Sequence, residues 1–162
     1  GRCVVMIKIN LVTVGKVKES YFKDAIAEYS KRLAAFCKFT IIEVKEENFR
    51  GESTQIAEKS VKSEGALIMQ KLAGYNIALA IEGEKISSEK LAEKIKKLTD
   101  GGTGEITFII GGSYGLSDEV KRACSEKISF SAMTFPHTLA RVIACEQVYR
   151  AFTIINGKEY HK

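Results

Sequence analysis

The sequence has no tryptophan, one proline and two histidines. The two histidines, His137 and His161, have no metal-ligand spacing to each other or to a cysteine, so we expect no metal site. No stretch approaches the roughly 20 apolar residues that a membrane-spanning helix needs, and we therefore expect no membrane association. The residues before Met6 are too few for a signal peptide.

Cysteines are also scarce, and none of them forms a Cys-x-x-Cys pair. The four are Cys3, Cys37, Cys124 and Cys145. Three of them fall in apolar patterns, which indicates buried free thiols in a reducing compartment. We therefore expect a cytoplasmic protein.

The bulk composition is that of an ordinary folded protein. The chain has 162 residues, of which 45% are hydrophobic and 28% are charged, and this predicts a single domain over residues 1–162. Residues 1–5 precede Met6, and we expect them to be an upstream or non-native extension. The net charge of +5 leans only weakly toward an anionic partner.

Hydrophobic periodicity predicts strands and helices in alternation. The predicted strands cover residues 6–14, 39–44, 77–81, 106–110 and 128–130. The predicted helices cover residues 19–36, 56–72 (closed by Gly74), a segment opening at Ser87 or Ser88, a short segment opening at Ser117, and 136–156 (capped by Gly157). Residues 45–54 and 82–85 are predicted loops. This order predicts an α/β fold with a parallel sheet and helices on both faces.

Two loops late in the chain follow predicted strands. The first, residues 111–115, is rich in glycine, and the second, residues 131–136, ends in the only proline. Because carboxyl ends of parallel strands lie at one edge of a sheet, these loops could form walls of one small-molecule pocket.

The glycine loop has several interpretations. Gly111-x-Ser113-x-Gly115 matches a hydrolase nucleophile elbow, with Asp118 and His137 following in the right order. Against this, the next helix starts too late after Ser113. Dinucleotide and nucleoside triphosphate loops fit poorly. A turn of small residues that brings backbone amides near a ligand remains, and so does a plain tight turn.

The apolar pattern of the last helix is interrupted by polar residues that need partners, either across an interface or in a site. These are Arg141, Glu146, Gln147 and Arg150.

Several motifs together resemble one family. They are Val14-Gly15-Lys16, Glu28-Tyr29, the paired glycines, the run Ser-Phe-Ser-Ala-Met-Thr-Phe-Pro-His at 129–137, and the ending Glu-Gln-Val-Tyr-Arg-Ala-Phe with Tyr-His-Lys. From Met6 to its end, the chain resembles the SPOUT-class ribosomal RNA large subunit methyltransferase H family. Members of that family methylate N3 of a pseudouridine in 23S rRNA.

The resemblance implies properties that periodicity does not reveal. Family members have an α/β fold with a deep C-terminal trefoil knot, they form homodimers, and they bind S-adenosylmethionine in the knot. The cofactor-binding positions of the family fall on Leu79, Gly111, Phe130, Ser131, Ala132, Met133, Thr134 and Phe135.

The implied chemistry requires the acceptor nitrogen to lose a proton, which a nearby cation or base would assist. Candidates are His137, Arg141, Arg150 and His161. Our hypothesis is that Arg150 and the tail Tyr160-His161-Lys162 face the base and the RNA backbone across the dimer. Two alternative interpretations remain open. In one, His137 starts a helix and bonds backbone groups, and in the other, Arg141 and Glu146 form a dimer-interface pair.

The sequence thus predicts a cytoplasmic S-adenosylmethionine-dependent methyltransferase that acts on 23S rRNA in assembled ribosomes and forms a homodimer. Two other classes stay in view. One is a small serine hydrolase that uses Ser113, and the other is a non-catalytic RNA-binding module of the same fold.

Overall fold

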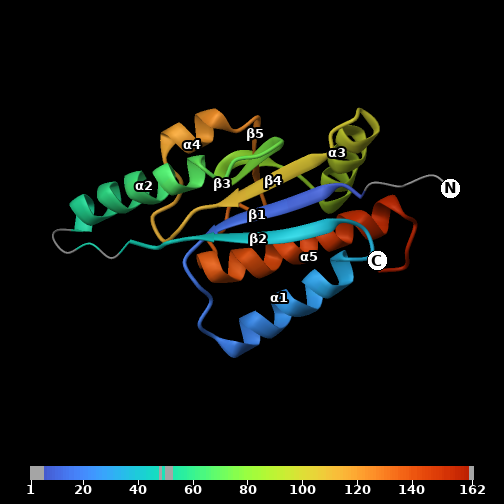
Figure 1. Cartoon of the computed structure of the whole chain (residues 1–162), viewed down its shortest axis with the longest axis horizontal. Helices are drawn as coiled ribbons and strands as arrows, with labels where there is room; N and C mark the ends of the chain where they lie inside the picture. Colours follow the sequence, from blue (N-terminus) through green and yellow to red (C-terminus); the bar gives the residue numbers. More distant parts are fainter. Residues whose placement is uncertain (1–5, 48, 50–52, 161–162) are drawn as a thin grey trace.

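A computed structural model of the chain describes residues 6–47, 49 and 53–160. Strands and helices alternate along them (Figure 1), which confirms the predicted α/β class. The strands are β1 (Lys8–Val14), β2 (Lys38–Val44), β3 (Tyr75–Lys85), β4 (Glu105–Ile110) and β5 (Glu126–Ser129). The helices are α1 (Ser20–Leu33), α2 (Ser53–Met69), α3 (Ser88–Asp100), α4 (Asp118–Ala123) and α5 (His137–Ile155).

The strands form one sheet in the order β2-β1-β4-β3-β5, and every neighbouring pair is parallel. The central strands β1 and β4 are buried along almost their whole length, as a strand covered on both faces requires. All carboxyl ends therefore lie at the same edge of the sheet.

Helices cover both faces of the sheet, as the sequence predicts. Because side chains alternate along a strand, Ile9 and Leu11 of β1 point to one face and Val12 and Val14 to the other. The first face packs against α1, α3 and α5, and the second packs against α2 and α4. Figure 1 shows α1 and α5 on the opposite side of the sheet from α2 and α4.

Three predicted helix ends are confirmed by their hydrogen bonds. The hydroxyls of Ser87 and Ser117 accept the backbone N–H groups of Lys90 and Val120, and so cap α3 and α4. Gly157 follows α5 with φ +65°, and the N–H of Lys158 reaches back to the carbonyl of Thr153. This pattern is a Schellman motif. No described helix, α5 included, is long and apolar enough to cross a membrane.

Two predicted boundaries are wrong. Gly74 does not cap α2, which ends at Met69. Instead Gly74 turns the chain into β3 with φ +65°, so close to Glu105 that a Cβ would lie 2.2 Å from the Glu105 carbonyl oxygen. A glycine that a turn requires was thus mistaken for a cap.

The predicted exit loop 82–85 is the other error. β3 continues to Lys85, and its pairing with β5 shifts, so that Leu79 and Glu84 both lie opposite Ile128. The residues between them form a bulge. Gly83 allows the bulge to lie against β5, because a Cβ there would be 2.7 Å from the backbone of Ile128.

The cysteines within the described residues are free thiols, as predicted. Burial raises the pKa of Cys37 and of Cys145 to about 12, and it also raises the pKa of the half-buried Cys124. These thiols are therefore protonated and unreactive at neutral pH. Cys3 lies outside the described residues.

Candidate functional site

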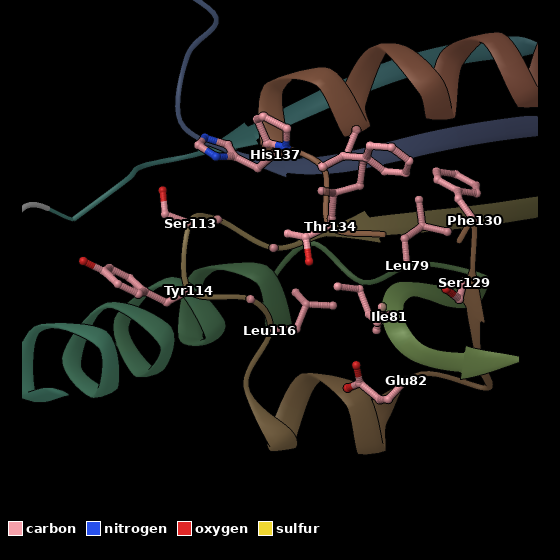
Figure 2. A pocket seen from close by; sticks show the side chains of 18 of the residues that line it. Leu79, Ile81, Glu82, Ser113, Tyr114, Leu116, Ser129, Phe130, Thr134 and His137 are labelled. Atoms are coloured by element: carbon pink, nitrogen blue, oxygen red, sulfur yellow. The ribbon is translucent and has the colours of Figure 1, made fainter. Parts of the chain in front are cut away.

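A cavity of about 840 Å³ lies at the carboxyl ends of β3, β4 and β5, a place where parallel sheets commonly bind ligands. Three segments form most of its wall: residues 79–82, which contain most of the β3 bulge, the glycine turn (110–116) and the β5–α5 segment (129–137). Figure 2 shows side chains from all three, with Ile81, Leu116 and Thr134 facing one another. The structure therefore brings together the loops 111–115 and 131–136, as predicted from the sequence.

Most of the predicted cofactor positions line this cavity. They are Leu79, Gly111, Phe130, Ser131, Met133, Thr134 and Phe135. Ala132 is absent from the lining.

The glycine turn needs its glycines for internal reasons. The N–H of Gly115 donates to the carbonyl of Gly112 at 3.1 Å, and Gly115 has φ +86°. A Cβ on Gly111 would lie 2.5 Å from the carbonyl carbon of Gly115. Gly111 is therefore a requirement of the turn itself, in addition to leaving room for a ligand.

The β5–α5 segment is shaped by its own hydroxyls. The hydroxyl of Ser129 donates to the carbonyl of Ser131 at 2.9 Å, and the N–H of Met133 donates to the Ser131 hydroxyl at 3.0 Å. Such local bonds hold a loop without help from secondary structure. They fix the backbone that carries Phe130 into the cavity.

Two charged residues of the cavity wall were not predicted from the sequence. Glu82, on the β3 bulge, forms an ion pair with Lys121 of α4, and both residues line the cavity. The hydrogen bond from Lys121 lowers the pKa of Glu82, which is therefore ionised at neutral pH. The position of Glu82 after a predicted parallel strand was a signal that could have found it.

Large apolar side chains are exposed around this cavity. Ile81, Tyr114 and Met133, one from each segment, are 49%, 51% and 72% exposed. Apolar groups concentrated at the rim of a cavity mark a surface that binds something.

The hydrolase interpretation of Ser113 is not favoured. α4 begins at Asp118, behind a Ser117 cap, so Ser113 is not at the start of a helix. Ser113 and His137 both line the cavity, but no hydrogen bond among the described residues links Ser113, His137 and Asp118. A hydrolase triad needs such bonds.

Arg141 is built into the interior of one chain. It is 2% exposed, and its guanidinium donates to Glu43 at 2.7 Å and to the carbonyls of Val14 and Gly15 at 3.1 Å each. The predicted dimer-interface pairing of Arg141 with Glu146 is therefore wrong. Arg141 instead ties α5, one turn after His137, to the carboxyl ends of β1 and β2.

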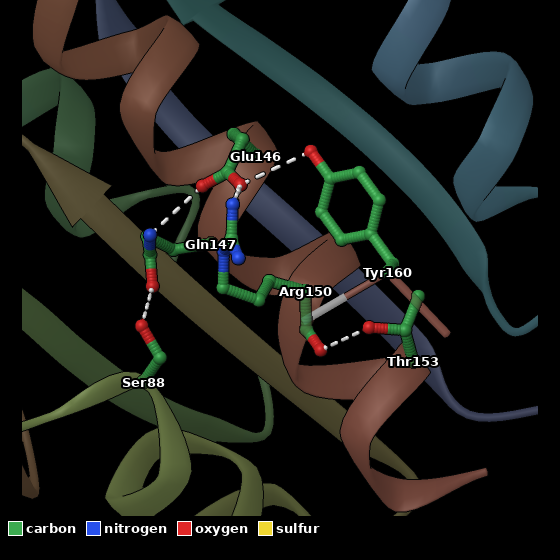
Figure 3. A network of polar contacts seen from close by, with 6 residues as sticks. All are labelled: Ser88, Glu146, Gln147, Arg150, Thr153 and Tyr160. Atoms are coloured by element: carbon green, nitrogen blue, oxygen red, sulfur yellow. Dashed lines mark hydrogen bonds and ion pairs between the residues drawn. The ribbon is translucent and has the colours of Figure 1, made fainter. Parts of the chain in front are cut away.

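The other polar residues of α5 form a network (Figure 3). Arg150 bonds Glu146 through Nε at 2.8 Å, and its guanidinium lies 4.8 Å from the centre of the Tyr160 ring. Tyr160 donates to Glu146, and Gln147 links Glu146 to Ser88. Burial raises the pKa of Tyr160, so this hydroxyl is a donor at neutral pH.

The predicted catalytic residues are not together within one chain. His137 starts α5 and lines the cavity, whereas Arg150 lies 13 residues further along the same helix. At 1.5 Å per residue this is roughly 20 Å. His161 lies outside the described residues, and no described group of three or more His, Cys, Asp or Glu could hold a metal ion.

Comparisons with known proteins identify the family. A family model described as "Predicted SPOUT methyltransferase" matches residues 7–161. The ribosomal RNA large subunit methyltransferase H of Bacillus pumilus is 49% identical over 157 residues, which cover 95% of this chain and 99% of that protein. The protein of the same name from Streptococcus thermophilus is 48% identical over 158 residues, covering 96% and 99%.

The chain belongs to the SPOUT methyltransferase family. The resemblance identified from the sequence is therefore confirmed, and the protein is an enzyme of the methyltransferase class.

Solved structures agree at the level of the fold. A Bordetella pertussis protein described as a probable methyltransferase has a TM-score of 0.55 at 12% identity, covering 90% of this chain and 96% of that one. A Haemophilus influenzae protein described as a probable methylase family protein has a TM-score of 0.52 at 15% identity, covering 98% of this chain and 72% of that one. The fold is therefore shared with proteins whose sequences are only 12% and 15% identical to this one.

Proposed function

We propose that this SPOUT methyltransferase transfers a methyl group from S-adenosylmethionine to N3 of a pseudouridine in 23S rRNA. The observation that carries the proposal is the cavity between the β3 bulge, the glycine turn and the β5–α5 segment. It occurs in a chain about half identical, over nearly its full length, to ribosomal RNA large subunit methyltransferase H proteins.

The cavity suits a cofactor of this size and character. Pockets for small molecules measure roughly 300–1,000 Å³ and are mostly apolar, with a few polar groups. Here apolar side chains share the walls with Glu82, Lys121, His137 and several hydroxyls. The residues that would hold S-adenosylmethionine are Leu79, Gly111, Phe130, Ser131, Met133, Thr134 and Phe135. The cofactor supplies a methyl group already activated on a sulfonium, so the protein must chiefly align the two reactants.

The site must also provide a group that accepts the proton from the acceptor nitrogen. His137 is the one imidazole that lines the cavity among the described residues. It could hold or accept a proton at a ring nitrogen. A guanidinium near the base would stabilise the negative charge left on the ring.

Arg150 can supply that guanidinium only from a second copy of the chain, because within one chain it lies about 20 Å along α5 from His137. We therefore extend the proposal to a homodimer. In it, Arg150, Tyr160 and His161 of one copy face the cavity of the other. The network around Glu146 would hold Arg150 in place for this task.

The path of the chain supports the proposed trefoil knot. After β5, at one edge of the sheet, the chain runs along the cavity past the β3 bulge and the glycine turn. α5 then docks on β1 and β2 through Arg141. We propose that this segment is threaded, and that residues 1–162 work as one domain. A chain pulled by its two ends would then stop short of its fully extended length, whereas an unknotted chain would reach it.

The proposed substrate is the assembled ribosome in the cytoplasm, because a net charge of +5 gives little surface for binding free RNA. We expect methylation of ribosomes to be much faster than methylation of naked 23S rRNA. Equal rates on both would contradict this choice of substrate.

Calorimetry with S-adenosylmethionine tests the cofactor. Gly111→Val puts a side chain against the backbone of Gly115 and deforms the turn that forms one wall of the cavity. Binding should therefore weaken by roughly ten- to a hundredfold, the equivalent of 1–3 kcal/mol of overpacking. Gly104→Val is the matched control, because a Cβ at Gly104 meets nothing within 4 Å. A non-catalytic binding module would give no heat at all, and a serine hydrolase would instead be labelled at Ser113 by a fluorophosphonate.

Mixed dimers test the shared site. Gly111→Val damages the cavity and Arg150→Ala damages the proposed facing end, so each variant alone should be nearly inactive. A mixture allowed to exchange subunits would contain dimers with one intact site and should regain activity. If the mixture is no more active than its components, Arg150 does not act across a dimer.

A further inference from the structure

A glutamate is buried on the face of the sheet opposite α5. Glu64 of α2 is 4% exposed and lies between the end of β1 and α4, in the region of the Val14, Ile68 and Val120 cluster. Its Oε1 atom has no hydrogen-bond partner. A buried carboxyl oxygen without a partner costs free energy, so its presence calls for an explanation.

The Glu64 carboxyl lies directly behind the glycine turn. A Cβ placed on Gly112 would be 2.8 Å from Glu64 Oε1 and 3.2 Å from Val14 Cγ1. There is therefore no space between the carboxyl and the backbone that forms the cavity wall. Any movement of one must move the other.

The charges facing Glu64 disfavour its ionised form. They come from Glu46 and Glu47, which follow β2, and among the described residues no cation offsets them. Burial, with these two acids, raises the pKa of Glu64 from 4.5 to about 7, although the N–H of Glu47 donates to the carboxylate and acts in the opposite direction. Both protonation forms are consequently present near neutral pH.

We propose that Glu64 is a positioning residue for the cofactor cavity, supporting the glycine turn only while its carboxyl carries a proton. This inference rests on the proposed function. An ionised Glu64 is stabilised by contact with water and by a greater separation from Glu46 and Glu47. Either change displaces the carboxylate against Gly112. A ligand that covers the turn removes water from it and thereby favours the neutral carboxyl. Cofactor binding must then take up a proton, and affinity falls as pH rises.

The test compares the wild type with Glu64→Gln, which keeps the shape and cannot ionise. S-adenosylmethionine affinity is measured by calorimetry from pH 6 to pH 8.5 in both proteins. Titration of the ligand affects both equally and cancels in the ratio of their affinities. We expect the wild type to lose about three- to tenfold in affinity relative to Glu64→Gln over this range, the size of a shift of up to one pKa unit on binding.

Two further variants exclude a merely structural role. Glu46→Gln removes a repelling charge, so the pH at which affinity falls should move downward. Glu58→Gln, on the exposed side of the same helix, should reproduce the wild-type profile. Identical profiles in the wild type and Glu64→Gln would overturn the inference while leaving the proposed function intact. No heat at any pH in the wild type would overturn the proposed function itself, and this inference with it.

Discussion

Two arginines on α5 show how differently one residue type can be used on a single helix. Arg141 is 2% exposed and bonds residues of β1 and β2, whereas the side chain of Arg150 is 25% exposed and bonds Glu146 of its own helix. The first joins α5 to the sheet, and the second bonds a residue one turn away on α5. A buried arginine whose terminal nitrogens all bond the sheet belongs to the architecture, whereas Arg150 is partly exposed and bonds within its own helix.

The largest expected effect on stability comes from the substitution of Arg141. Arg141→Ala leaves Glu43 and two buried carbonyls without their partner, and should cost about 3–5 kcal/mol of the free energy of unfolding. Urea unfolding measures this loss. A cost below about 1 kcal/mol would mean that the buried arginine is not what fastens α5 to β1.

Arg150→Ala should change stability little and activity strongly. Its ion pair with Glu146 is partly exposed and within one helix, so the free energy of unfolding should change by less than about 1 kcal/mol. Methylation of ribosomes should nevertheless fall by roughly a hundredfold, with S-adenosylmethionine affinity unchanged. Activity close to wild type would remove Arg150 from the proposed mechanism.

Glu64 extends the comparison because it is buried like Arg141, but no cation lies opposite its charge among the described residues. Its pKa in the folded state, about 7, lies above the ordinary 4.5, so its contribution to stability is full below pH 4.5 and is lost as pH rises through 7. Relative to Glu64→Gln, the wild type should lose roughly 2 kcal/mol between pH 5 and pH 8. Unfolding curves at the two pH values measure the difference, and a constant difference would contradict it.

The smallest effect concerns the partner of Arg150. Tyr160→Phe keeps the ring under the guanidinium and removes the hydrogen bonds of the hydroxyl, which are the 3.2 Å bond to Glu146 and a bond with Tyr29. We expect less than about 1 kcal/mol in stability and a severalfold loss of activity as Arg150 becomes less well held. Activity lower than that of Arg150→Ala would show that the hydroxyl has a role of its own.

Sequence patterns predicted the alternation of elements, the parallel sheet and the two loops that meet at the cavity, because these follow from period and chain order. They did not predict features that depend on contacts between segments distant in the sequence. Gly74 and Gly83 read as a cap and a loop residue, yet each permits backbone contact with a neighbouring strand. Arg141 was expected to need a partner, but the sequence did not indicate that the partners are the ends of β1 and β2. Nothing local in the sequence indicates that Glu64 is buried.

The hydrogen bonds of Arg141 also constrain the order in which the protein can be made. They join it to residues 98, 126 and 127 positions earlier in the chain. During synthesis the ends of β1 and β2 therefore leave the ribosome long before the helix that closes over them. Until α5 arrives, the sheet face that it covers stays open, and the cavity lacks the wall formed by the β5–α5 segment. Folding of this enzyme thus ends at its C-terminus, and contacts of such long range make that last step slow.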